Sequence, residues 1–92
     1  MYQVKFTTAF KKSYKLMIKR GYDIRLLDDV IVLLAQGEAL PEKYKDHSLT
    51  GKYTGFRECH IKPDWLLIYL IEKDILTLTM VDTGTHADLF QK

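Results

Sequence analysis

The candidate catalytic residues of this chain are a few polar residues close to a strongly apolar run. His60 and Asp64 shortly precede seven consecutive apolar residues, 65–71. His86 lies in a polar segment after the next predicted strand, and His47 lies in a polar stretch upstream. Histidine has an ordinary pKa near about 6.5, so it can donate or accept a proton at neutral pH. The three histidines are therefore candidates for acid–base catalysis, and Asp64 is a candidate to orient or polarise an imidazole.

Three predicted strands surround these residues. Residues 53–60 mix aromatic, β-branched and charged side chains, which is typical of a half-buried strand. The run 65–71 has the pattern of a central strand covered on both faces. Pro63 cannot donate a hydrogen bond to a β-ladder and is expected in the turn between these two strands. Residues 75–82 have alternating faces and predict a third strand.

An antiparallel meander of these strands would bring their polar ends together. The end of the first strand, the start of the second and the end of the third lie at one edge of such a sheet. His60, Asp64 and His86 are therefore expected to converge. His47 lies in a long connection, 37–52, whose spacing does not fix whether it reaches this edge. A connection of this length in a small domain is more often functional than idle.

Two helices are predicted in the N-terminal half. Thr7 or Thr8 can cap the first helix by accepting from its free N–H groups, and Gly21 ends it. Asp23 caps the second helix, and Gly37 ends that one. Apolar residues recur at helical spacing in both segments, so each helix has one face for a core. The short connection between them predicts a helical hairpin.

The predicted order is a strand at 2–6, two helices and then three strands. This order indicates an α+β fold of two layers, with a helical hairpin packed on a mainly antiparallel four-stranded sheet. The first strand is expected to join the sheet, because alone it would leave its backbone groups unpaired. We expect one domain over residues 1–92.

The composition is that of a globular protein, with 47% hydrophobic residues and a net charge of +2. No apolar run approaches the roughly 20 residues of a membrane span, and the first residues lack a signal-peptide pattern. Cys59, the single cysteine, cannot form an internal disulfide and is expected to be a small buried residue. These features favour a cytoplasmic protein.

Positive charge is concentrated near the N-terminus. Residues 1–25 contain seven lysines and arginines and one acidic residue. A basic first helix could contact phosphate. A solvated helix face would produce the same pattern, so both interpretations stay open.

Four runs of residues carry a resemblance to a known family. They are residues 44–49 (Tyr-Lys-Asp-His-Ser-Leu), 55–60 (Gly-Phe-Arg-Glu-Cys-His), 63–69 (Pro-Asp-Trp-Leu-Leu-Ile-Tyr) and 83–90 (Thr-Gly-Thr-His-Ala-Asp-Leu-Phe). Together, at these spacings, they resemble the YafQ branch of the RelE toxin superfamily, over nearly the whole chain. The resemblance implies a RelE-like fold and a toxin of a bacterial type II toxin–antitoxin pair.

The resemblance also implies an activity. Toxins of this kind enter the A site of the 70S ribosome and cut the mRNA there, and a cognate antitoxin wraps and silences them. For this chain it implies a ribosome-dependent endoribonuclease without a cofactor, with a DinJ-like antitoxin, the ribosome and mRNA as partners and no membrane. The implied catalytic set is His47, His60, Asp64 and His86. The expected RNA contacts are Arg57, Lys52 and Phe90.

The chemistry of RNA cleavage fits these residue types. RNA carries its own nucleophile, the 2′-hydroxyl, so the enzyme needs a base, an acid and positive charge for the developing phosphorane. We assign His86 as the acid and His47 or His60 as the base, although these labels could be exchanged. Asp64 would orient an imidazole or share the base role, and Arg57 would pair with phosphate.

Other interpretations compete with this one. Three histidines and Asp64 could bind a metal, but the chain has no His-x-x-x-His or Cys-x-x-Cys spacing. The same fold could serve a non-enzymatic, ParE-like toxin that acts by binding a protein. A third alternative is an RNA-binding module that does not cleave. Trp65 and Tyr69 are expected in the core rather than as stacking platforms for bases.

Overall fold

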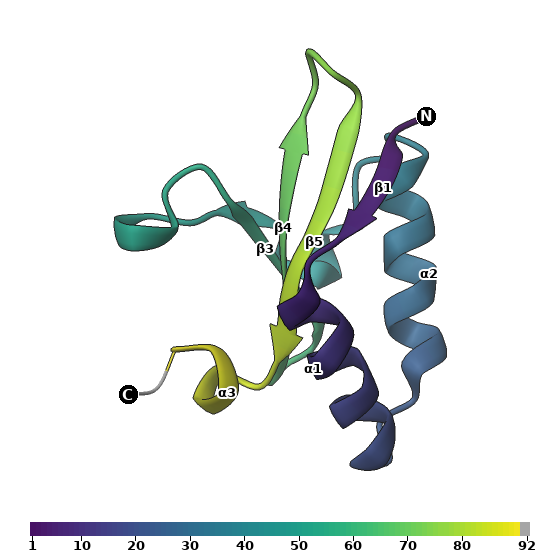
Figure 1. Ribbon diagram of the computed structural model, residues 1–92, viewed down its shortest axis with the longest axis vertical. Coiled ribbons are helices and arrows are strands. Elements are labelled where there is room, and N and C mark those ends of the chain that lie inside the picture. Colours follow the sequence, from purple (N-terminus) through teal and green to yellow (C-terminus); the bar gives the residue numbers. More distant parts are fainter. Residues whose placement is uncertain (91–92) are drawn as a thin grey trace.

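The computed structural model describes residues 1–90, which form a five-stranded sheet, two helices on one of its faces and a short C-terminal helix (Figure 1). The helices are α1 (Thr8–Lys19), α2 (Ile24–Ala35) and α3 (His86–Phe90). The strands are β1 (Gln3–Phe6), β2 (His47–Ser48), β3 (Arg57–Lys62), β4 (Trp65–Glu72) and β5 (Thr77–Gly84). Their order in the sheet is β1-β5-β4-β3-β2, with β1 parallel to β5 and the other pairs antiparallel.

The main core lies between the helical pair and the sheet. It contains Phe10 and Met17 of α1, Leu27 and Val30 of α2, and residues of β3, β4 and β5. The first five residues of β4 are at most 1% exposed, because helices cover one face of this strand and a smaller apolar cluster covers the other. The smaller cluster contains Leu66, Ile68 and Leu89, with Leu49, Tyr53, Phe56, Val81 and Phe90 packed against it.

The predicted α+β fold is confirmed, and so are several local details. Thr7 caps α1 by accepting from the Phe10 N–H at 2.9 Å, and Asp23 caps α2 by accepting from the Arg25 N–H at 3.2 Å. Pro63 lies in the turn between β3 and β4. Of the helices formed by residues 1–90, none is long and apolar enough to cross a membrane.

Two elements were not predicted. The sheet has five strands rather than four, because β2 adds a two-residue pairing to the outer side of β3. A strand this short leaves no alternating pattern in the sequence. The C-terminal segment forms α3 rather than an irregular tail. Both elements carry a histidine, so the two unpredicted elements are parts of the candidate site.

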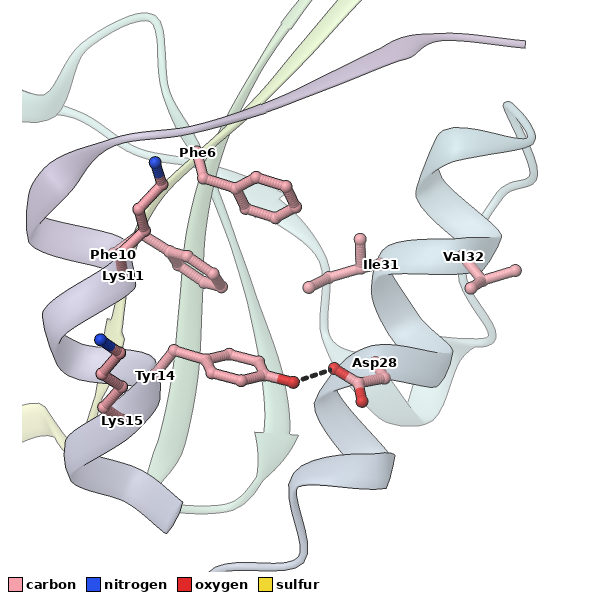
Figure 2. Close-up of a pocket in the computed structure, with 8 residues that line it drawn as sticks. All are labelled: Phe6, Phe10, Lys11, Tyr14, Lys15, Asp28, Ile31 and Val32. Atoms are coloured by element: carbon pink, nitrogen blue, oxygen red, sulfur yellow. Dashed lines mark hydrogen bonds between the residues drawn. The ribbon is translucent and has the colours of Figure 1, made fainter. Parts of the chain in front are cut away.

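A groove of about 460 Å³ separates α1 from α2 (Figure 2). Its lining is mainly apolar, with Lys11 and Lys15 of α1 also bordering it. The apolar lining residues are Phe6, Phe10, Tyr14, Ile31 and Val32. The Tyr14 hydroxyl crosses to α2 and donates to the Asp28 carboxylate at 2.8 Å.

Candidate active site

The three histidines lie side by side on the face of the sheet opposite the helical pair. The ring centroid of His60 lies 6.3 Å from that of His47 and 5.8 Å from that of His86. His47 comes from β2, His60 from β3 and His86 from the first position of α3. Side chains of successive strand residues point to opposite faces, and His47 is in register with Glu58. His47, Glu58 and His60 therefore share one face.

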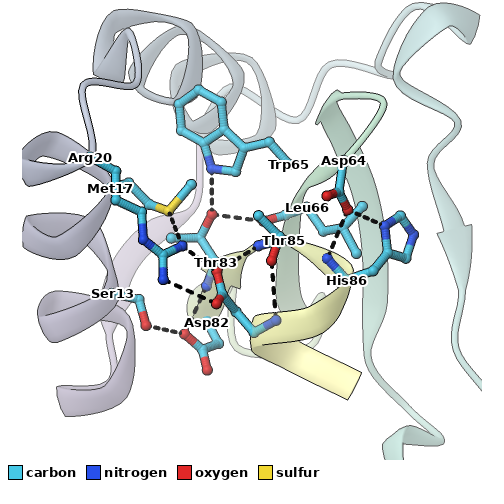
Figure 3. A network of polar contacts seen from close by, with 11 residues as sticks. Ser13, Met17, Arg20, Asp64, Trp65, Leu66, Asp82, Thr83, Thr85 and His86 are labelled. Carbon is cyan, nitrogen blue, oxygen red and sulfur yellow. Dashed lines mark hydrogen bonds and ion pairs between the residues drawn. The ribbon is translucent and has the colours of Figure 1, made fainter. Parts of the chain in front are cut away.

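Asp64 joins this group through His86. One oxygen of Asp64, Oδ1, accepts from the backbone N–H of His86 at 2.9 Å and lies 2.5 Å from its Nδ1 (Figure 3). An ionised carboxylate can only accept, so Nδ1 carries a hydrogen and Nε2 is the ring nitrogen that Asp64 does not engage. The hydrogen bonds from His86 lower the pKa of Asp64. Asp64 is therefore a stable anion that fixes both the ring and the backbone of His86.

Glu58 is a site residue that the sequence interpretation missed. Its side chain is only 7% exposed, and its Oε1 lies 3.3 Å from Nε2 of His47 and 3.5 Å from Nε2 of His60. A buried carboxylate needs such partners, because it has lost its water. The signal was present in the sequence, since Glu58 and His60 are two residues apart in a strand and must share a face.

The backbone of Lys45 fixes the orientation of the His47 ring. Nδ1 of His47 lies 2.7 Å from the carbonyl oxygen of Lys45, which can only accept, so Nδ1 carries a hydrogen. Oε1 of Glu58 lies within 3.5 Å of Nε2 of both His47 and His60, so these three side chains form one cluster on this face of the sheet.

Arg57 lies on the other face of β3, among the residues covered by the helical pair. Its guanidinium donates to the Asp46 carboxylate at 3.1 Å and to the Ser48 hydroxyl at 2.8 Å. The buried Tyr69 hydroxyl also donates to Asp46. Hydrogen bonding to Asp46 raises the pKa of Arg57, and burial followed by the Asp46 hydrogen bond raises that of Tyr69. Arg57 therefore fixes the segment that carries His47 and is not grouped with the histidine rings.

The other two expected RNA contacts both lie against Tyr53. Phe90 packs edge-on against the Tyr53 ring, with centroids 5.6 Å apart. Lys52 is exposed, and its Nζ lies 5.8 Å from the same ring. Phe90 is half-buried on the smaller apolar cluster, so it anchors α3 and leaves part of its ring accessible.

Comparison with known proteins identifies the family. A family model described as the bacterial toxin of a type II toxin–antitoxin system, YafQ, matches residues 2–91. The chain belongs to the YafQ family. The mRNA interferase toxin YafQ of Escherichia coli strain K12 is 39% identical over 88 residues, which cover 95% of this chain and 94% of that protein.

Solved structures agree with this assignment to the YafQ family. The E. coli DinJ–YafQ complex contains a chain that is 37% identical, with a TM-score of 0.90 over 98% of this chain and 99% of that one. A metal-bound toxin from Helicobacter pylori is 44% identical, with a TM-score of 0.91 over 98% of this chain and all of that one. The resemblance found in the sequence and the RelE-like fold are thereby confirmed.

The alternative of a metal site concerns the same histidines and Asp64. In residues 1–90, no group of three or more His, Cys, Asp or Glu side chains is arranged to hold a metal ion. Cys59 is fully buried, as predicted, and burial raises the pKa of its thiol. It points to the face opposite His60, so it is neither a ligand partner of the histidines nor a nucleophile.

Proposed function

We propose that this YafQ-family toxin is an endoribonuclease that cleaves mRNA in the ribosomal A site by metal-independent acid–base catalysis. The observation that carries the proposal is the line of three imidazoles with two carboxylates, Glu58 within reach of both His47 and His60, and Asp64 beside His86. A pure binding protein does not need this set. The relative at 39% identity bears the name mRNA interferase toxin, which supports the endoribonuclease class.

The proposed reaction uses the 2′-hydroxyl of the RNA as the nucleophile. His47 or His60 removes its proton, and the 2′ oxygen forms a bond to the adjacent phosphorus. The bond from phosphorus to the 5′ oxygen breaks, and His86 protonates that oxygen. The products are a 2′,3′-cyclic phosphate and a free 5′-hydroxyl, so no water, metal or oxidant is consumed.

Each side chain has a defined part in this scheme. Asp64 holds the Nδ1–H of His86, so Nε2 is the nitrogen that donates when the ring is an imidazolium. Glu58 can accept the proton from whichever histidine acted as base, which restores that histidine for the next turnover. Lys52 is exposed beside Tyr53, and Phe90 packs against the same ring, so these two residues would contact phosphate and a base. Arg57 would contribute positive charge from the far side of β3, in addition to holding Asp46.

The proposed partners follow from the same surfaces. E. coli YafQ has been crystallised with DinJ, and we propose that a cognate antitoxin with an acidic or amphipathic segment covers the basic α1 of this chain. Lys11 and Lys15 flank the apolar groove between α1 and α2, which suits such a segment. Binding to the ribosome should weaken with added salt, because phosphate contacts release counterions.

Primer extension tests the function directly. An mRNA on purified ribosomes is incubated with wild-type protein, with His86→Gln or with Arg25→Gln, each with and without ribosomes. Glutamine keeps the size of His86 but cannot donate a proton as an acid, whereas Arg25 lies at the start of α2. The proposal expects cleavage within the A-site codon that requires ribosomes, disappears in His86→Gln and persists in Arg25→Gln.

Three other results would redirect the assignment. Cleavage of free RNA alone would retain the nuclease and remove its ribosome dependence. No cleavage in any reaction, while the protein still arrests growth, would favour the ParE-like alternative that acts by binding a protein. Loss of cleavage in chelator would replace the metal-independent mechanism.

A further inference from the structure

Two side chains of α1 reach the C-terminal part of the chain, one at β5 and one at α3. Ser13 donates to Asp82 Oδ1 at 2.6 Å, and Arg20 pairs with Asp88 through two contacts of 2.6 and 3.2 Å (Figure 3). The Arg20 and Asp88 side chains are 37% and 30% exposed. This two-contact geometry fixes both the distance and the angle between the groups, which a single-contact surface pair does not.

Asp88 also closes the first turn of α3. Its Oδ2 accepts from the Thr85 N–H at 2.9 Å, and its own N–H donates to the Thr85 hydroxyl at 3.1 Å. This reciprocal pattern is a capping box, with His86 as the first residue inside it. One carboxylate therefore both starts α3 and attaches it to α1.

Gly84 permits this attachment. A Cβ added at Gly84 would lie 2.9 Å from Cβ of Asp88 and 3.0 Å from its Oδ2. Real Cβ atoms do not approach other atoms this closely, so a side chain here would displace Asp88. The end of β5 thus leaves room for the carboxylate that faces Arg20.

A helix of five residues has no stability of its own. The direction of His86 must therefore come from the contacts of its neighbours. Asp64 holds the His86 ring, but its own side chain is 66% exposed and lies in a turn. The Arg20–Asp88 pair provides a second, independent attachment on the opposite side of α3.

We propose that Arg20 and Asp88 are positioning residues for His86, holding α3 so that this imidazole faces His60. Neither touches the reacting atoms. The kinetic part of this inference rests on the proposed endoribonuclease function, whereas the positional part does not. Loss of the pair should lower the rate of the chemical step more than the affinity for RNA.

The test compares Arg20→Gln, Asp88→Asn and their double variant in single-turnover cleavage of ribosome-bound mRNA. We expect each single variant to be about tenfold slower at saturating toxin, with half-saturation changed less than twofold. The double variant should be no slower than either single one, because both remove the same contact. Asp88→Glu should recover most of the rate, since glutamate suits the capping box. Arg25→Gln breaks an exposed pair with Asp23 and should match wild type.

Hydrogen exchange at the His86 amide is the second readout, because this N–H is donated to Asp64. Exchange should accelerate several-fold in Arg20→Gln and Asp88→Asn but not in Arg25→Gln. If wild type does not cleave RNA, the proposed function fails while this measurement still tests the positioning. Unchanged exchange in both variants, or rate losses that multiply in the double variant, would overturn the inference.

Discussion

A single oxygen of Asp64 meets both the backbone N–H and the ring Nδ1 of His86, at 2.9 and 2.5 Å. This double contact places a hydrogen on Nδ1 of His86 and holds both its ring and its backbone. It also lowers the pKa of Asp64, through the hydrogen bonds that His86 donates. The carboxylate of Asp64 therefore stays ionised at pH values below the ordinary aspartate pKa of about 3.9.

Asp64→Asn should reduce the single-turnover cleavage rate by about 10- to 100-fold. Asparagine can still accept from His86, so the loss reports the missing charge rather than a missing contact. Because the pKa of Asp64 is lowered, the carboxylate stays ionised throughout pH 5 to 8. The ratio of wild-type to variant rates should therefore be constant over this range. A ratio that shrinks toward pH 5 would mean that Asp64 gains a proton there, against this interpretation.

Glu58→Gln should slow cleavage at least tenfold while leaving the protein folded. The substitution keeps the size of a side chain that is 7% exposed but removes the charge shared by His47 and His60. The rate and the thermal midpoint are measured in parallel. Glu38→Gln, at an exposed position after α2, is the control. A rate equal to that of the control would exclude Glu58 from the site.

Tyr69→Phe should slow cleavage through His47. The Tyr69 hydroxyl and Arg57 both donate to Asp46, which directly precedes His47 in the chain. Removing the hydroxyl leaves Asp46 with one partner fewer and should cost about 1 kcal/mol of folding free energy. Tyr14→Phe is matched to it, because it also removes a hydroxyl donated to an aspartate, Asp28, but in the groove between the helices (Figure 2).

Comparing Tyr69→Phe with Tyr14→Phe separates an effect on folding stability from an effect on the orientation of His47. Both should unfold at lower urea concentration than wild type, and only Tyr69→Phe should lose activity. Equal activity in the two variants would show that the Asp46 contacts do not orient His47. Arg57→Lys adds a further comparison, since lysine keeps the charge that RNA would meet but cannot make both contacts to Asp46 and Ser48.

The convergence of His60, Asp64 and His86 could be predicted because it depends on strand order alone. The apolar run of β4, the proline in the turn and the alternation in β5 determine the meander, and the meander determines which ends meet. The caps Thr7 and Asp23 were equally predictable, because capping is a local interaction. These are the parts of the fold where sequence pattern and tertiary structure agree.

The positions of His47 and Arg57 depend on tertiary contacts that a local sequence pattern does not predict. His47 reaches the site through a two-residue strand held by Asp46, Arg57 and Tyr69, which come from three separate segments. Arg57 was predicted from its charge to pair with phosphate. In the structure it lies on the face of β3 opposite the histidines, where it contacts Asp46. The sequence pattern for Glu58 was present and was overlooked, since an isolated glutamate in a strand usually faces solvent.

Thr83→Val should lower the free energy of unfolding by about 2 kcal/mol. The Thr83 hydroxyl is buried, accepts from Trp65 Nε1 at 3.0 Å and donates to the Leu66 carbonyl at 2.7 Å (Figure 3). Valine fills the same space but leaves both partners unsatisfied in the core. Urea denaturation of Thr83→Val is compared with Thr79→Val, at a half-buried position of the same strand. Similar losses in both variants would contradict this account of Thr83.

The Arg20–Asp88 pair should make stability depend on pH in a defined window. Arg20 and the Thr85 N–H lower the pKa of Asp88 to about 2, whereas in the unfolded chain it is about 3.9. A group whose pKa is lowered in the folded state stabilises the protein at pH values above its unfolded-state pKa. This stability is lost as the pH falls through its folded-state pKa.

Asp88→Asn should therefore cost about 0.5 to 1 kcal/mol between pH 5 and 8, a small value because the pair is partly exposed. The difference from wild type should shrink as the pH falls from about 4 to about 2, measured by urea denaturation at each pH. Asp23→Asn is the matched control, since asparagine also caps a helix and Arg25 is far more exposed. Its effect should be smaller at every pH. A difference for Asp88→Asn that grows below pH 4 would show that Asp88 is destabilising when charged.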